Sequence, residues 1–409
     1  MSRVRCSPAV LRGSVRVPLS KSAAHRAMIG AFLAGTPNPL PKDEPLSADL
    51  AATKSALTAL RAAQQSGSSA YIDCGESGST LRFLVPVAAA LGIPTAFTGH
   101  GRLPQRPIGI YLNCLPLHGA TCKSTGGLPL HVSGKLRPGI YSLPGNISSQ
   151  FITGLMLSLP LLNGDSEIRL TSPLESAGYT DLTVNILAEH GIRILPTKAG
   201  WSVPGTQKYL PSVACIERDW SQAAYFLAAG ALGGKVELSG LRRGSAQGDR
   251  TAEELFRRFG ARLSWNGSVL TAEPGELRGI EIDAAQIPDL VPILAVTAAA
   301  ARGRTVIRNA ERLRLKESNR LAAMADGLSA LGAHIRETED GLCIDGVECL
   351  HGGTAEGRND HRIVMAMAVA ALASNEEVTI TDSESICKSY PDFFRDYNTL
   401  GGKAYELGE

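Results

Sequence analysis

The sequence has little net charge, few aromatic residues and no cysteine pair at a metal-binding spacing. Of 409 residues, 41 are Lys or Arg and 39 are Asp or Glu, so the formal net charge is only +2. That balance does not indicate a nucleic-acid or acidic-membrane partner. Aromatic residues make up 5%, which argues against the stacking surface of an RNA-binding protein. Any anion site must come from the local placement of Lys and Arg.

Targeting and metal-binding signals are also missing. The eight cysteines show no C-x-x-C spacing and none lies beside a His in a zinc-like cluster. We expect them to be reduced and mostly buried, and we expect no metal and no cofactor. The N-terminal segment MSRVRCSPAVLRGSVRV has no apolar core, so it does not resemble a signal peptide. The longest apolar run, residues 291–301, is too short to span a bilayer. These features predict a cytoplasmic protein.

One pattern recurs six times along the chain: a polar cluster followed by an Ala- or Leu-rich apolar stretch. The copies are KSAAHRAMIGAFLAG, ESGSTLRFLVPVAAALG, SSQFITGLMLSLPLL, SQAAYFLAAGALGG, PDLVPILAVTAAAARG and NDHRIVMAMAVAALAS, which start at Lys21, Glu76, Ser148, Ser221, Pro288 and Asn359. Each stretch is long enough for a helix of about three turns and is apolar nearly all round, which is typical of a buried helix.

Short β-type segments such as YIDCG, TAFTG, SEIRL, KVELSG and EVTITD separate the copies. The sequence therefore predicts an α/β protein of six units, each with a few strands around one buried helix, divided three and three between two similar domains. The Pro-rich segment 36–49 is predicted to be a surface loop. The polar residues fall at the starts of the buried helices, where unpaired N–H groups attract anions. Simple N-capping is the alternative reading of these polar residues.

Several of these starts carry residues suited to binding anionic substrates. Lys21, Ser22 and Arg26 lie together, and Ser22 and Arg26 share a helix face. Gly78 precedes Arg82 and permits close backbone approach to a ligand. Other candidates are the loop arginines Arg102 and Arg106, the run Ser148, Ser149 and Gln150, the pair His361 and Arg362, and Lys388 near the C-terminus. For each of these, a solvated surface or capping role is the alternative.

Two carboxylates are candidates for proton transfer. Asp289 stands alone before an apolar run, where the pKa of a carboxyl group is raised unless a cation partners it. Such a group suits a general base for a hydroxyl. Glu317 lies in the dense segment RLRLKESNRL, in which Lys316 and Arg320 have the i, i+4 spacing of neighbours on one helix face. A solvated charged helix is the alternative interpretation of this segment.

Taken in order, these segments resemble the enolpyruvyl transferase family, and within it the shikimate-pathway branch. The motifs PLSKSAAHRA, SSQF, IPD, LKESNR, NDHR and KSYPDFF occur in the order expected of that family and cover nearly the whole chain. The resemblance implies two similar inside-out α/β domains, each of three βαβαββ-type units, that close over the substrates. It places residues 1–18 and 219–409 in one domain, with the phosphoenolpyruvate side and the catalytic Asp and Glu. Residues 19–218 then form the other domain, which mainly binds shikimate 3-phosphate.

The resemblance also implies roles for individual residues. Asp289 would take the proton from the 5-hydroxyl of shikimate 3-phosphate, with Lys316 beside it, and Glu317 would protonate the methylene of phosphoenolpyruvate. The residues implied to bind shikimate 3-phosphate are Lys21, Ser22, Arg26, Ser148, Ser149, Gln150, Ser176, Tyr179, Asp289 and Lys316. Those implied to bind phosphoenolpyruvate are Lys21, Gly78, Arg106, Gln150, Arg320, Arg362 and Lys388. Lys21 is shared and counts among the catalytic groups. A monomer without a metal or cofactor is expected.

Four positions depart from the commoner family pattern, namely Leu19, Phe83, Arg312 and Asn319. Two alternatives remain beside the shikimate-pathway branch. The sister branch acts on UDP-N-acetylglucosamine, but it usually carries Cys or Asp in the loop that here reads GHGRLPQRPIG and has neither. A non-catalytic anion- or RNA-binding protein of a related fold is the other alternative, and the low net charge and few aromatic residues argue against it.

Overall fold

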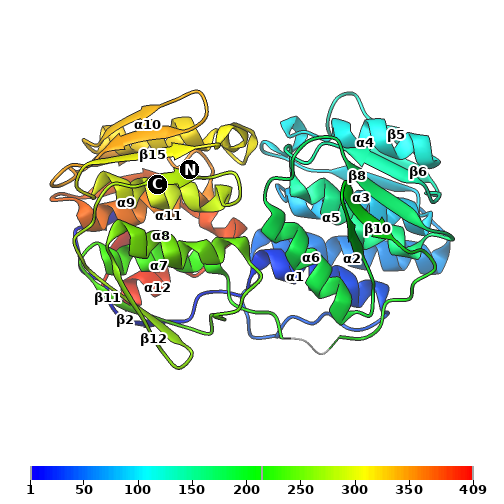
Figure 1. Cartoon of the computed structure of the whole chain (residues 1–409), viewed down its shortest axis with the longest axis horizontal. Helices are drawn as coiled ribbons and strands as arrows, with labels where there is room; N and C mark the ends of the chain where they lie inside the picture. The colour runs from blue at the N-terminus through cyan, green and yellow to red at the C-terminus, as the bar shows by residue number, and fades with distance from the viewer. Residues whose placement is uncertain (1, 213–214, 408–409) are drawn as a thin grey trace. The chain divides into compact units, whose positions relative to one another are not determined.

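The computed structural model describes residues 2–212 and 215–407, which divide into two units. The first unit holds the residues up to Ser20 and those from Glu217 onward, and the second holds Lys21–Ile216 (Figure 1). Inside the first unit, the two crossing segments pair with each other. The Ser20 amide donates to the Glu217 carbonyl at 2.8 Å, and the Asp219 amide donates to the Pro18 carbonyl at 3.0 Å.

The described strands form five four-stranded sheets that share one plan. In each, a first strand runs parallel to a second, and a third and a fourth follow antiparallel. In four of the sheets the last two strands are a hairpin whose later strand lies beside the second strand, and in the fifth they are the N-terminal and C-terminal strands of the chain. The two sheets of the second unit are β3 (Ala70–Asp73), β4 (Thr95–Thr98), β6 (Leu130–Gly134), β5 (Ala120–Lys123), and β7 (Ile140–Leu143), β8 (Ser166–Leu170), β10 (Gly200–Val203), β9 (Leu195–Thr197). In both of these sheets a helix connects the two parallel strands, because parallel strands need a crossover.

The first unit has three sheets on the same plan, two of which use N-terminal strands. They are β14 (Glu281–Asp283), β15 (Arg304–Arg308), β17 (Leu342–Asp345), β16 (His334–Glu337); β2 (Arg12–Val15), β11 (Lys235–Ser239), β13 (Val269–Glu273), β12 (Arg262–Asn266); and β18 (Gly353–Ala355), β19 (Val378–Thr381), β1 (Arg3–Ser7), β20 (Lys403–Leu407). In the last sheet, Val4 of β1 faces Ile380 of β19. The N-terminal strand β1 therefore belongs to a sheet whose other three strands come from the C-terminal end of the chain.

The six predicted apolar stretches are all helices, and the α/β prediction is confirmed. They are α1 (Lys21–Leu33), α3 (Gly78–Leu91), α5 (Ser149–Ser158), α7 (Trp220–Ala231), α9 (Val291–Ala299) and α11 (His361–Ala370). Every residue of α7, α9 and α11 is buried. Side chains of Ser77, Ser148, Asp219 and Asp360 accept amide hydrogen bonds as N-caps. A single 3-10 turn, Pro288–Leu290, precedes α9.

Each unit also has shorter or more exposed helices, which follow the buried ones in the chain. These are α2 (Ala48–Ser66), α4 (Gly109–Cys114), α6 (Ala177–Glu189), α8 (Ala252–Phe259), α10 (Arg320–Ala330) and α12 (Phe393–Thr399). In the first unit, α7, α9 and α11 pack against one another. In the second unit, α3 packs on α5, while α1 packs on α2 and α6.

One of the six repeats is abbreviated. The pair α1 and α2 has no sheet of its own, because residues 34–47 and 67–69, all of which the structure describes, contain no strand. The longer connection is the predicted loop, and its four prolines cannot donate backbone hydrogen bonds to a sheet. Only three residues separate α2 from β3, too few for a hairpin. The second unit therefore keeps six helices but only two described sheets.

The prediction that most cysteines are buried is wrong. All eight are free; Cys6, Cys74, Cys114 and Cys343 are buried, Cys122 is half-buried, and Cys215, Cys349 and Cys387 are exposed. The exposed ones lie in segments that connect the main strands and α-helices, where no core is available to cover them. No helix among the described residues is long and apolar enough to cross a membrane.

Candidate active site

In the first unit, Asp289 lies at the centre of a cluster of cations. It sits in the 3-10 turn before α9. The carboxylate accepts from Lys316 Nζ at 3.3 Å, Arg320 Nη1 at 2.9 Å and Arg362 Nη2 at 3.0 Å. Asp289 is therefore a partnered carboxylate, although the residues that follow it in sequence are apolar.

Arg320 holds the acidic groups of this cluster together. Its side chain is 1% exposed and also donates to Glu317 Oε2 at 2.7 Å and to Asp360 Oδ2 at 2.9 Å. Burial lowers the pKa of this guanidinium, but the neighbouring Asp360, Glu317 and Asp289 more than offset that effect and raise it above its ordinary value. Arg320 thus stays charged and fixes Asp289 and Glu317 within reach of one guanidinium.

Lys316 does not lie on a helix with Arg320, so the helical i, i+4 interpretation of this segment is wrong. A 3-10 turn covers Glu311–Leu315, Lys316 is extended, and α10 begins only at Arg320. The extended backbone lets Lys316 reach Asp289. Burial lowers the pKa of the Lys316 ammonium, and Asp289 partly opposes that shift. A lysine in this setting can exchange a proton more readily than one on the surface.

Arg362 and Lys388 join the cluster from α11 and from the segment near the C-terminus. Besides Asp289, Arg362 Nη2 donates to Ser221 Oγ at 3.1 Å, and Nη1 donates to the Asp289 carbonyl at 3.1 Å. Lys388 is 8% exposed and donates to the Asn359 carbonyl at 2.6 Å. Asn359 has φ +50°, which turns its carbonyl toward this lysine at the start of α11. The first unit thus gathers six of the predicted residues: Asp289, Lys316, Glu317, Arg320, Arg362 and Lys388.

In the second unit, α1 presents Lys21 and Arg26 in different ways. Lys21 Nζ is 2.8 Å from Asp49 Oδ2 at the start of α2, and both side chains remain partly exposed. Arg26 is 2% exposed, and burial lowers its pKa to about 9. Its guanidinium donates to Thr183 Oγ1, the Ser22 carbonyl, Thr153 Oγ1 and the Tyr179 carbonyl, at 2.7, 2.6, 3.1 and 3.0 Å. Most of the donors of Arg26 therefore tie α1 to α5 and α6.

The starts of α3 and α5 are joined by a second arginine. Arg82 Nη1 donates to Gln150 Oε1 at 2.7 Å, and Gln150 Nε2 donates to Ser79 Oγ at 3.0 Å. A Cβ at Gly78 would lie 2.7 Å from Arg82 Nη1 and 2.9 Å from Arg106 Nη1. Two guanidinium groups therefore pass close over the backbone at Gly78, and a larger residue there would make them shift. The predicted residues Gly78, Arg106 and Gln150 are thus brought together.

The remaining predicted residues lie at the starts of α5 and α6. Ser148 caps α5 by accepting from the Gln150 amide at 3.3 Å, and Ser149 is buried in the first turn. Ser176 precedes α6 with φ +58°, a left-handed conformation that is uncommon for a serine. The Tyr179 carbonyl accepts from Arg26. In the second unit, every predicted residue therefore lies at or near the start of α1, α3, α5 or α6, or in the loop before α4.

Asp49, Arg82 and Asp360 belong to these clusters but were given no substrate-binding or catalytic role from the sequence. Asp360 is 0% exposed and binds both Arg320 and Ser318 Oγ, the latter at 3.0 Å. Asp49 pairs with Lys21, and Arg82 orients Gln150. Asp360 and Arg82 stand in the polar clusters that open α11 and α3, which was a usable signal. Asp49 follows a Pro-rich loop, and nothing near it in the sequence marks it.

The four unusual positions have ordinary structural places. Leu19 forms an isolated antiparallel β-bridge with Arg218 through the backbone. Phe83 is buried, with the Arg26 guanidinium carbon 5.0 Å from its ring centre. Arg312 donates to the Ala285 carbonyl, and Asn319 caps α10 by accepting from the Ala322 amide at 3.3 Å. None of the four disturbs the clusters described above.

The chain is similar to known proteins along nearly its whole length. A family model described as EPSP synthase (3-phosphoshikimate 1-carboxyvinyltransferase) matches residues 7–397. A 3-phosphoshikimate 1-carboxyvinyltransferase of Clostridium acetobutylicum is 42% identical over 432 aligned positions, covering 100% of both chains. That of Clostridium novyi is 40% identical and covers 98% of each. An EPSP synthase structure from Acinetobacter baumannii covers 100% of both chains with a TM-score of 0.80 and 25% identity. The fold is thus that of an enolpyruvyl transferase.

Within that class, the chain belongs to the EPSP synthase family. The predicted resemblance is confirmed at the level of the family.

Proposed function

We propose that this chain transfers the enolpyruvyl group of phosphoenolpyruvate to the 5-hydroxyl of shikimate 3-phosphate, releasing phosphate. The observation that carries the proposal is the grouping of Asp289 and Glu317 on one buried arginine, Arg320. Two carboxylates held by fixed cations suit a reaction that removes one proton and delivers another. The family and the relatives bear the name of this reaction.

The reaction proceeds by addition and then elimination. Asp289 accepts the proton of the 5-hydroxyl as its oxygen forms a bond to C2 of phosphoenolpyruvate, and Glu317 gives a proton to C3. The resulting tetrahedral intermediate loses phosphate from C2 and a proton from C3, which restores the double bond. Lys316 lies beside Asp289 with a lowered pKa, so it can relay the proton.

The cations bind the substrates. Arg320, Arg362 and Lys388 of the first unit, with Arg106, Gly78, Gln150 and Lys21 of the second, bind phosphoenolpyruvate in this proposal. Ser22, Arg26, Ser148, Ser149, Gln150, Ser176 and Tyr179 bind shikimate 3-phosphate together with Lys21. Preorganised cations stabilise the charge that develops on the leaving phosphate.

The acid–base pair works because its ionic partners are fixed before substrate binds. Arg320 and Arg362 already form hydrogen bonds to Asp289, so little reorganisation is needed when charge moves. Substrate anions must compete with Asp49 for Lys21.

We also propose a monomeric state and a cytoplasmic location, which sedimentation and fractionation would test.

The direct test is phosphate release by the purified chain from phosphoenolpyruvate, with shikimate 3-phosphate in one reaction and UDP-N-acetylglucosamine in another. Release with shikimate 3-phosphate alone is expected. Release only with the sugar nucleotide would move the chain to the sister branch, and release with neither would contradict the proposal. The loop GHGRLPQRPIG lacks the Cys or Asp of that branch, which is why the first outcome is expected.

A further inference from the structure

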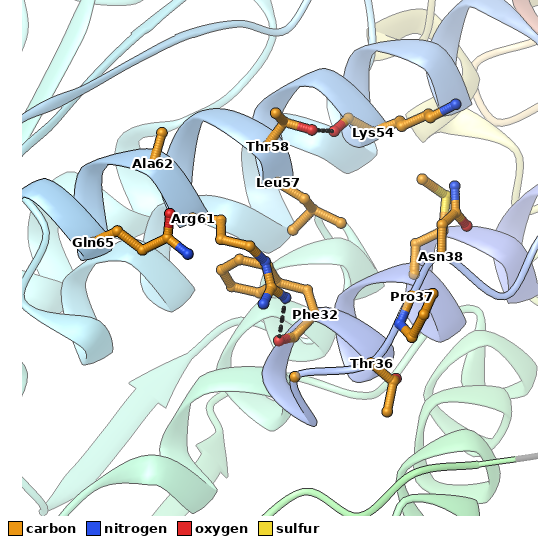
Figure 2. A pocket seen from close by; sticks show the side chains of 12 residues that line it. Phe32, Thr36, Pro37, Asn38, Lys54, Leu57, Thr58, Arg61, Ala62 and Gln65 are labelled. Carbon is orange, nitrogen blue, oxygen red and sulfur yellow. Dashed lines mark hydrogen bonds between the residues drawn. The ribbon is translucent and has the colours of Figure 1, made fainter.

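The abbreviated repeat exposes a pocket between α1 and α2. Twelve residues line a cavity of about 530 Å³ on the α1–α2 pair and the segment 35–38 (Figure 2). That volume falls within the roughly 300–1,000 Å³ typical of small-molecule sites. Its apolar floor is formed by Met28, Phe32 and Leu57, which are 2%, 8% and 7% exposed. The pocket lies on the helix pair that has no sheet of its own.

The pocket is separate from the predicted substrate groups on the same helix. Lys21 and Phe32 are eleven residues apart on α1, which corresponds to about 16 Å along the axis. Met28 is two residues beyond Arg26, so the two side chains leave the helix roughly 200° apart. Arg26 faces Thr153 and Thr183, whereas Met28 faces the pocket. A ligand there would not touch the groups assigned to shikimate 3-phosphate.

The charge of the pocket is of one sign. Lys54 and Arg61 line it, and none of the twelve lining residues is acidic. The Arg61 guanidinium lies over the Phe32 ring, 4.9 Å from its centre, and Nη2 donates to the Phe32 carbonyl at 3.0 Å (Figure 2). The Arg61 guanidinium has five N–H donors. Among the residues that the structure describes, it donates only this one hydrogen bond. No carboxylate among the described residues pairs with Lys54 or Arg61.

We propose that this pocket is a binding site for a small organic anion, a carboxylate on a planar apolar ring. The ring would lie on Met28, Phe32 and Leu57, and the carboxylate would accept from Arg61, which is held in place by its bond to the Phe32 carbonyl. An arginine fork matches the two oxygens of a carboxylate. Thr36, Asn38 and Gln65 add neutral polar groups to the lining. The site goes beyond the enolpyruvyl transfer proposed above and does not depend on it.

Calorimetric titration of the full chain tests the site with three probes. Phenylacetate has both ring and charge, 2-phenylethanol has the ring alone, and acetate has the charge alone. We expect phenylacetate to bind at least 10-fold more tightly than either partial probe. We also expect its affinity to be unchanged when shikimate 3-phosphate and phosphoenolpyruvate are present. No binding of phenylacetate at millimolar concentration, or its displacement by the substrates, would overturn the proposal.

Three variants locate the binding. Arg61→Gln should weaken phenylacetate about 10-fold, and Ala62→Trp should abolish binding by placing an indole across the pocket. Ala51→Trp is the matched control, because Ala51 is also exposed on α2 but does not line the pocket. Circular dichroism confirms that each variant folds. Unchanged phenylacetate affinity in both Arg61→Gln and Ala62→Trp, or equal loss in Ala51→Trp, would contradict the assignment.

Discussion

The two units differ in how they hold the helices that carry their charged groups. In the first unit, α7, α9 and α11 are buried throughout, pack against one another and accompany three sheets. In the second unit, two described sheets accompany α3 and α5, while α1 packs on α2 and α6 without a sheet of its own. The helix starts keep their charged residues in both units. The sheet is therefore not what positions those residues.

Polar side chains take over the role of the missing sheet around α1. Arg26 binds α5 and α6, and Lys21 binds Asp49 of α2. His25 Nδ1 is 2.8 Å from Thr53 Oγ1, which is 2.7 Å from Thr80 Oγ1 of α3. These buried hydrogen bonds fix the direction of α1, although His25 Nε2 is buried without a hydrogen-bond partner among the described residues. The comparison predicts that chemistry depends most on the first unit and that α1 depends most on polar contacts.

The largest expected effect is a loss of kcat, and it should differ between two carboxylates that pair with cations of the site, Asp289 and Asp49. Asp289→Asn should lower kcat about 1,000-fold, because a general base contributes roughly 10²- to 10⁴-fold. Asp49→Asn should lower it less than about 10-fold, since Asp49 only positions Lys21. Steady-state phosphate release measures both. Near-normal turnover of Asp289→Asn, or equal losses in the two variants, would remove the assignment of Asp289 as the base.

The next effect concerns the buried ion pair of the first unit. Asp360→Asn removes the buried carboxylate that pairs with the Arg320 guanidinium. Because a buried charge then loses its partner, we expect the unit to be destabilised by about 3–5 kcal/mol. Asp345→Asn removes an exposed carboxylate from Arg304 in the same unit and serves as control, with little change expected. Urea unfolding measures the difference. Similar midpoints for the two variants would show that the buried pair does not hold this unit.

Arg26→Met tests whether polar contacts hold α1. The side-chain volume is roughly kept, but Thr183, Thr153 and the Tyr179 carbonyl lose their donor. We expect a loss of about 2–3 kcal/mol in urea unfolding, since each buried group left unpaired costs about 1–3 kcal/mol and partial rearrangement offsets some of that. Arg169→Met, which removes only an exposed pair with Glu167, is the control. An unchanged midpoint for Arg26→Met would mean that apolar packing alone suffices.

The smallest effect is a pH dependence from His25. Burial, followed by the nearby Lys21 and Arg26, lowers the His25 pKa well below 6.5. The unfolded chain therefore binds this proton first as pH falls, so stability is lost below about pH 6.5, by about 1.4 kcal/mol per pH unit. His25→Asn should remove that part of the acid sensitivity between pH 7.5 and 5. A variant with the same pH slope as the parent would show that His25 titrates normally.

Much of the fold could be predicted because the buried helices are apolar on every side. The predicted strand segments, such as SEIRL and KVELSG, are also strands. Missed strands such as β9 and β16 lie at sheet edges and are mostly exposed, so their sequences carry little apolar alternation. The missing sheet beside α1 and α2 was not predicted, because the helical pattern there is as strong as in the other repeats.

The candidate site was predictable where a residue's own segment carries the signal. Lys21 and Arg362 stand in polar clusters at the starts of buried helices, and Asp289 is a lone carboxylate at such a start. Partners distant in sequence could not be found in that way. Asp360 meets Arg320 across 40 residues, and Lys21 meets Asp49 across 28. Only the folded chain brings such carboxylates to their cations.

The central claim is enolpyruvyl transfer by addition and elimination, and the most direct measurement is mass spectrometry of the product formed in D₂O. The purified chain with phosphoenolpyruvate and shikimate 3-phosphate should yield 5-enolpyruvylshikimate 3-phosphate with deuterium in its methylene group, because C3 is protonated and deprotonated on the way. Inorganic phosphate should appear in equal amount. Transfer without deuterium in the methylene group, or no transfer at all, would contradict the account.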